Sequence, residues 1–273
     1  MLLTRILTAV VLVAAFIPAL FLSSNMVWAI SMLIISLLAL YEWAKLIGMT
    51  QAVAVAYILF CGALGVAMLY LMEVNGFHWL FYQSLLVFVI ALIFWMFIVP
   101  VLLTKFIVIQ NKWLLLFLGI LLMAPLWLAL ISVKGADPWL LLALLATIWI
   151  ADTAAYFTGK NFGKRKLAPS ISPGKTWEGV IGALLAVSVF GGMLYFSGAV
   201  SSVAIFPLLW LVAILGVVGD LFESLIKRQA NKKDSGNLLP GHGGILDRID
   251  GLMPSLPIAV LMIYLFNYYQ VVS

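Results

Sequence analysis

Residues 113–133 read WLLLFLGILLMAPLWLALISV, a stretch without a single charged side chain. A helix needs about 20 consecutive apolar residues to cross the hydrocarbon core of a bilayer, and this stretch supplies them. The whole chain is 66% hydrophobic and 9% charged, with a mean hydropathy of +1.21. Soluble domains are about 45–50% apolar and about 25% charged. A lipid bilayer is therefore the expected solvent for most of this protein.

Similar apolar runs recur along the sequence and predict about nine transmembrane helices. The runs lack the alternation of barrel strands, and lipid-exposed backbone needs internal hydrogen bonds, so we expect an all-α polytopic membrane protein. The first run also resembles a signal peptide, but no small-x-small cleavage site precedes Ser23, and we expect a retained helix. The predicted segments are 3–22, 26–44, 52–72, 79–101, 113–133, 138–158, 177–197, 201–223 and 252–271.

The lysines and arginines predict how these helices are oriented. Basic residues in short loops stay on the cytoplasmic side, and of the 15 bases only Lys134 falls outside the amino terminus and the even-numbered loops. We therefore expect a multi-pass protein of a plasma or bacterial inner membrane, with the amino terminus inside and the carboxyl terminus outside. The basic excess then reflects topology, and we expect no nucleic-acid partner.

The polar residues divide the chain into two regions. Residues 1–135 have short loops without recognisable chemistry, and we expect five supporting or dimerising helices there. Residues 136–273 contain two longer cytoplasmic loops, 159–176 and 224–251, each with five lysines or arginines. Function is therefore expected in the second region, at the cytoplasmic face.

Two aspartates lie inside predicted transmembrane segments. Asp152 stands in the sixth segment and Asp220 near the cytoplasmic end of the eighth. A carboxylate at the bilayer centre costs about 2.5–3.5 kcal/mol, less toward the interface, so each needs a cation, a metal ion or a water cavity. Pairing with a loop lysine or arginine is the simpler alternative to a functional role.

The eighth loop ends in glycines and two further aspartates. Asp247 and Asp250 are three residues apart, which on a helix places them on one face where they can share a hard cation. Acids at a helix start can also merely complement its dipole. The glycines beside His242 permit positive φ, so the amides of Gly243 and Gly244 can cradle phosphate, although a plain turn looks similar. His242 itself is either a turn residue or a phosphate contact.

The sixth loop contains Gly174-Lys175-Thr176. It is not a P-loop, because Pro169 stands where the first glycine belongs and we expect no β-strand before it. Lys175 is expected to contact substrate. The bases at 164–166 are instead assigned to topology control or to attraction of anionic lipid.

The stretch from Ser224 to Asp250 resembles the signature of phosphatidate cytidylyltransferases, also called CDP-diacylglycerol synthases. That signature is Ser-x-hydrophobic-Lys-Arg, four residues, Lys-Asp, then His-Gly-Gly and Asp-Arg-x-Asp. The stretch 172–179, Asp152 and Gly219-Asp220 are similar to this family as well, whereas residues 1–135 resemble it only as hydrophobic helices. The resemblance implies transfer of CMP from CTP to phosphatidic acid, giving CDP-diacylglycerol and pyrophosphate, and a homodimer.

In the implied reaction two polyanions must meet. A phosphomonoester with a second pKa of about 6 is already ionised at pH 7, so the enzyme needs charge neutralisation more than a general base. Divalent metal and basic side chains would supply it. We therefore expect more than one metal ion, including Mg²⁺, on Asp220, Asp247 and Asp250, with Asp152 as a further ligand. The expected contacts to substrate come from Lys175, Lys227, Arg228, Lys233, Arg248, Ser172, Thr176, His242, Gly243 and Gly244, with Lys227 counted among the catalytic residues.

Three other functions use the same residues. In an ion-coupled transporter the acids inside the membrane would be cation sites, but such sites lie near the midplane and usually accompany repeats. A scaffold that binds anionic lipid through its basic loops would tolerate Asp-to-Asn changes. A related nucleotidyltransferase or lipid kinase would act on another phospholipid or a polyprenol, and a substrate panel would separate it.

Overall fold

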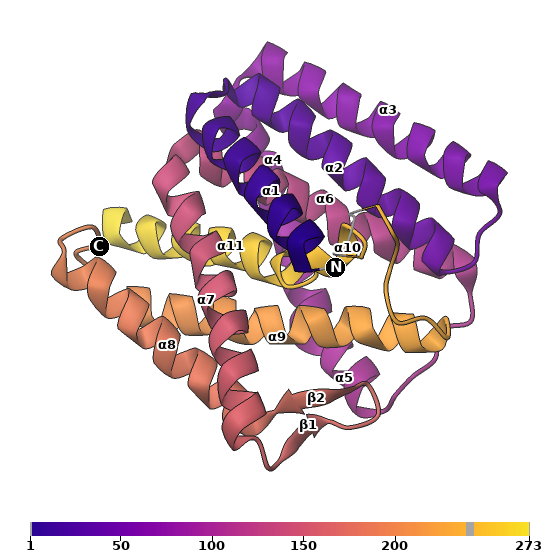
Figure 1. The fold of residues 1–273 in the computed structure, drawn as a ribbon. Helices are drawn as coiled ribbons and strands as arrows, with labels where there is room; N and C mark the ends of the chain where they lie inside the picture. Colours follow the sequence, from indigo (N-terminus) through magenta and orange to yellow (C-terminus); the bar gives the residue numbers. More distant parts are fainter. Residues whose placement is uncertain (1, 239–242, 273) are drawn as a thin grey trace.

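The computed structural model describes residues 2–238 and 243–272, which form a bundle of long helices (Figure 1). Eight helices in the described parts are long and apolar enough to cross a membrane, and α1 adds a shorter apolar stretch, Val13–Leu22. The predicted all-helical membrane fold is thereby confirmed. The helices are α1 Leu2–Leu22, α2 Asn25–Leu46, α3 Gln51–Asn75, α4 Phe77–Ile93, α5 Val99–Thr104, α6 Lys112–Ala136, α7 Pro138–Phe162, α8 Trp177–Phe196, α9 Ile205–Gln229, α10 Leu246–Ile249 and α11 Leu252–Val272.

The main hydrophobic core joins the two regions of the chain. The indole N–H of Trp43 in α2 donates to the carbonyl of Leu115 in α6 at 2.7 Å, and that of Trp28 donates to Leu130 at 3.1 Å. Helix α11 packs against α9 and also against α6 and α4 of the first region. The helices after residue 136 therefore rest on those before it. The functional division at residue 135 stays a prediction.

Helices α4 and α5 are joined by a π-helical turn, η1, Phe94–Ile98. Such turns are rare and frequently occur beside functional sites. The rings of Phe94 and Trp95 contact Phe222 of α9, with centroids 5.8 and 5.4 Å apart. The turn therefore packs against α9 two residues beyond Asp220.

The sixth loop contains a small hairpin of β1, Lys166–Ala168, and β2, Ser172–Thr176, paired antiparallel. The expectation that no strand precedes Lys175 was wrong. The open end of the hairpin is held by three hydrogen bonds: Trp177 N–H donates to the Arg165 carbonyl at 3.0 Å, and the Glu178 carboxylate accepts from the amides of Lys164 and Arg165. A P-loop remains excluded, since that motif needs a parallel strand-loop-helix unit.

Lys134, the base on the predicted outer side, joins α6 to the start of α2 and the end of α1. It is buried at the end of α6, and its ammonium group donates to the Ser23 carbonyl and the Asn25 side chain, both at 2.8 Å. The lysine thus satisfies a carbonyl at the end of α1, where helices leave such groups unpaired. The membrane orientation itself stays a prediction.

Candidate active site

Asp220 of α9 forms an ion pair with Lys175 of β2. The Lys175 ammonium lies 2.7 Å from the Asp220 carboxylate, and the two side chains are 22% and 38% exposed. The same ammonium group lies 3.4 Å from the Val217 carbonyl, and Ser224 donates its hydroxyl to Asp220 at 3.2 Å. The hairpin therefore brings the lysine of the sixth loop onto the acid of α9.

Lys227 of α9 bridges two carboxylates. Its ammonium group lies 2.6 Å from Glu223, one turn earlier, and 2.6 Å from Asp247 of α10. The three side chains are between 2% and 11% exposed. One cation therefore joins α9 to the turn that begins α10.

Asp247 also accepts hydrogen bonds from the loop before it. The amide of Gly244 donates at 2.9 Å, and the amide and hydroxyl of Ser235 donate at 3.1 and 3.0 Å. Gly243 has a φ of +83°, the kind of backbone conformation that the glycines of this turn were expected to permit. The Gly244 amide, expected on phosphate, donates to Asp247 in this structure.

Asp250 and Asp152 lie within electrostatic reach of the Lys175–Asp220 pair. Asp250 interacts with Asp220, Glu223 and Lys175, and Asp152 interacts with Lys175 and Asp220. The backbone of Asp250 packs directly on α9, where any side chain at position 219 would collide with its carbonyl. The four predicted aspartates, from α7, α9, α10 and the turn after α10, therefore interact with Lys175 or Lys227.

This cluster is rich in carboxyl groups. Five of them, those of the four aspartates and Glu223, interact with the ammonium groups of Lys175 or Lys227. Within residues 2–238 and 243–272, no group of three or more His, Cys, Asp or Glu is already arranged to hold a metal ion. Closely spaced carboxylates nevertheless favour a bound cation, and carboxylate oxygens are the donors that Mg²⁺ prefers. The residues therefore fit magnesium in charge and chemistry, provided that the Lys175–Asp220 pair opens.

The remaining predicted site residues lie around this cluster in different settings. Arg228 donates its Nε–H to the Ile171 carbonyl at 3.3 Å and so ties the hairpin to α9. Thr176 is buried, and its hydroxyl accepts from the Gly179 amide at 3.1 Å as the cap of α8. Ser172 pairs with Ala168 in the hairpin, and Lys233 and Arg248 are exposed. His242 lies outside the described residues.

Two functional candidates were missed from sequence. Glu223 is 1% exposed and belongs to the bridge through Lys227. Glu42, on α2, is 4% exposed and accepts the amide of Leu246 at 3.0 Å. Glu223 could have been found, because it is an acid within a transmembrane segment, four residues before a lysine. Glu42 carries no comparable local signal.

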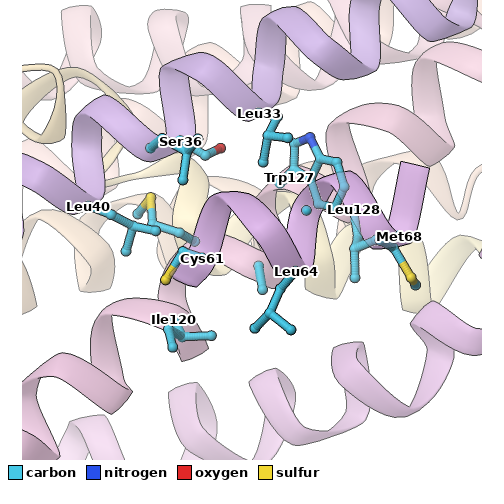
Figure 2. Close-up of a pocket in the computed structure, with 13 residues that line it drawn as sticks. Leu33, Ser36, Leu40, Cys61, Leu64, Met68, Ile120, Trp127 and Leu128 are labelled. Atoms are coloured by element: carbon cyan, nitrogen blue, oxygen red, sulfur yellow. The ribbon is translucent and has the colours of Figure 1, made fainter. Parts of the chain in front are cut away.

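A separate cavity lies between α2, α3 and α6 (Figure 2). It has a volume of about 310 Å³ and is lined mainly by hydrocarbon, with Ser36, Cys61, Met68 and Trp127 among its walls. Its lining residues include no Asp, Glu, His, Lys or Arg, so this cavity offers no charged side chain for catalysis.

The chain matches the cytidylyltransferase family over residues 3–266 and therefore belongs to that family of nucleotidyl-transferring enzymes. It is 37% identical over 276 residues to the phosphatidate cytidylyltransferase of Pseudomonas aeruginosa, covering 97% of each chain. It is 33% identical over 280 residues to the enzyme of that name from Haemophilus influenzae, covering 94% of this chain and 96% of the relative. A third relative with that name, from Thermotoga maritima, is 41% identical over 128 residues, which cover 44% of this chain and 47% of the relative. The family resemblance read from the signature is confirmed.

Proposed function

We propose that this chain transfers CMP from CTP to phosphatidic acid, producing CDP-diacylglycerol and pyrophosphate. The observation that carries this proposal is the similarity to two phosphatidate cytidylyltransferases along nearly the whole chain. The gathered carboxylates and lysines supply a site suited to that chemistry. CTP would come from the cytoplasm, while the acyl chains of the lipid would stay in the bilayer.

The reaction needs one substitution at phosphorus. An oxygen of the phosphatidate phosphate forms a bond to the α-phosphorus of CTP, and the bond from that phosphorus to the bridging oxygen of the β-phosphate breaks. The electron pair leaves with pyrophosphate. Because the attacking phosphate is already ionised near neutral pH, no serine, cysteine or histidine nucleophile is required. Orientation and charge neutralisation would provide most of the rate enhancement.

Lys175 would exchange the Asp220 carboxylate for a substrate phosphate as its partner. In the structure it pairs with Asp220 while remaining 22% exposed, so an arriving phosphate can reach it. Transfer of the ammonium group to phosphate would free the Asp220 carboxylate. Asp220, Asp250 and Asp152 would then hold magnesium, which when bound neutralises the triphosphate and the leaving pyrophosphate.

Asp247 would act mainly through the hydrogen bonds that hold its carboxylate in place. Both of its oxygens accept hydrogen bonds, from Lys227 on one side and from Ser235 and Gly244 on the other. It would join a metal ion only by giving up Lys227. Arg228, Lys233 and Arg248 would bind the outer phosphate groups of CTP or lipid.

A substrate panel with purified protein tests this proposal. We expect pyrophosphate and CDP-diacylglycerol in equal amounts from CTP, phosphatidate and magnesium. ATP in place of CTP, or polyprenyl phosphate in place of phosphatidate, should support far slower release. Faster turnover of another nucleotide or another lipid phosphate would overturn the substrate assignment. No pyrophosphate release with any pair would instead favour the transporter or scaffold.

A further inference from the structure

The carboxyl-terminal part of α2 contacts the loop that carries Asp247 and Asp250. Glu42 is 4% exposed, and its carboxylate accepts the amide of Leu246 at 3.0 Å, across 204 residues of sequence. Leu246 is the first residue of α10 and directly precedes Asp247. A residue of the amino-terminal region thus binds the backbone from which a site carboxylate projects.

The loop backbone encloses this carboxylate closely. A β-carbon at Gly236 would collide with one oxygen of Glu42, and a β-carbon at Gly244 would lie 2.6 Å from the other. The Leu246 amide binds one of these oxygens, Oε2, and the other, Oε1, is buried without a hydrogen-bond partner among the described residues. These glycines therefore allow the loop to wrap around Glu42, whose two oxygens can only accept hydrogen bonds.

A second contact fixes the same loop to the same turn of α2. The ammonium group of Lys232 donates to the carbonyl of Lys45 at 3.2 Å. The loop is therefore attached to α2 at Lys232, before the glycines, and at Leu246, after them. The intervening Ser235 and Gly244 both donate to Asp247, so the position of the loop determines the hydrogen bonds of that aspartate.

We propose that Glu42 is a positioning residue for nucleotidyl transfer, holding the start of α10 so that Asp247 and Asp250 face α9. This inference rests on the proposed function and assigns a role to the amino-terminal region. A buried carboxylate is costly without partners, so a merely structural contact would be served more cheaply by a neutral acceptor. Glutamine would keep an acceptor for the Leu246 amide but would lose the second carboxylate oxygen and the negative charge.

The test compares Glu42→Ala and Glu42→Gln with Glu73→Gln, which changes an exposed acid at the end of α3. We expect Glu42→Ala to lower kcat at saturating substrates at least 10-fold and to raise the magnesium concentration for half-maximal rate. Glu42→Gln should lie between alanine and wild type, and Glu73→Gln should match wild type. Amide hydrogen exchange in residues 243–250 should become faster in the same order, without added substrates or metal.

These measurements separate the two proposals. If wild type does not use CTP and phosphatidate, the proposed function fails, and the exchange data still test whether Glu42 holds the loop. The positioning role is overturned if exchange in residues 243–250 is unchanged in both Glu42 variants. It is also overturned if the variants melt earlier but keep the wild-type kcat and magnesium dependence per folded molecule. Should Glu42→Ala not fold, the glutamine variant decides by the same criteria.

Discussion

Replacing Lys227 with methionine removes the ammonium group that lies 2.6 Å from both Glu223 and Asp247. Methionine keeps the length and the apolar stem, so the change removes charge with little loss of packing. Asp247 would retain the donors of Ser235 and Gly244. Among the described residues Glu223 has no second donor, and one of its oxygens is already buried without a partner. Lys227→Met therefore destabilises the fold mainly by leaving the Glu223 carboxylate without a partner.

The expected loss of stability follows from the different hydrogen-bond donors that Asp247 and Glu223 retain. Removing one partner of a buried ion pair costs about 3–5 kcal/mol, because a charge is left uncompensated. We expect the lower end, about 3 kcal/mol less free energy of unfolding for Lys227→Met, because Asp247 keeps its hydrogen bonds from Ser235 and Gly244. Adding Glu223→Gln removes the uncompensated charge, so the double variant should return to within about 1 kcal/mol of wild type. Its activity should stay low, because Asp247 has lost its cation.

Equilibrium unfolding in mixed detergent micelles, titrated with SDS, measures these differences. The set consists of wild type, both single variants and the double variant, with Lys166→Met as the control at an exposed lysine of the hairpin. The control should change stability by less than about 0.5 kcal/mol. The reasoning is refuted if Lys227→Met lies within about 1 kcal/mol of wild type, or if adding Glu223→Gln gives no recovery.

Three further predictions concern the hairpin and the topology. Lys175→Met should lower turnover about 100-fold, because a phosphate-binding cation is lost. The magnesium concentration for half-maximal rate should not rise, because the substitution releases Asp220. A higher concentration in a magnesium titration would contradict this role. Thr176→Val should lower the free energy of unfolding by about 1 kcal/mol through loss of the helix cap, and Thr176→Ser should not; a fall in kcat that follows the hydroxyl would indicate substrate contact instead. In a cysteine-free background, an impermeant maleimide should label Ser170→Cys only in inside-out vesicles and Ser201→Cys only in right-side-out vesicles, and the reverse pattern would contradict the orientation.

The helices were predictable because the bilayer imposes their length. The segment predicted at 113–133 is observed as Lys112–Ala136, and that predicted at 201–223 as Ile205–Gln229. Helix α9 continues past the apolar part because its backbone hydrogen bonds persist and Lys227 finds carboxylate partners. Hydropathy therefore predicts the spanning part of a helix well and its polar end poorly.

Residues of the candidate site were predictable where the local sequence alone carries a signal. An acid inside an apolar run is costly wherever it folds, so Asp152 and Asp220 could be identified from sequence alone. The contact between Glu42 and Leu246 depends on how α2 packs beside a distant loop, and no sequence pattern encodes that. The hairpin was missed for a similar reason, since its short strands are held by Glu178 rather than by alternation.

We propose that Asp220, Asp247 and Asp250 collect hard cations so that two phosphate compounds can react beside the membrane. The most direct test of this proposal is the rate of CDP-diacylglycerol formation from CTP and phosphatidate with magnesium, in Asp220→Asn, Asp247→Asn and Asp250→Asn. Asparagine keeps the shape and removes the charge, and unfolding titrations of each variant verify that the fold is retained. We predict that each variant loses at least about 100-fold in rate, as expected for loss of a group that stabilises transition-state charge. Rates within a few-fold of wild type in all three folded variants would contradict the account.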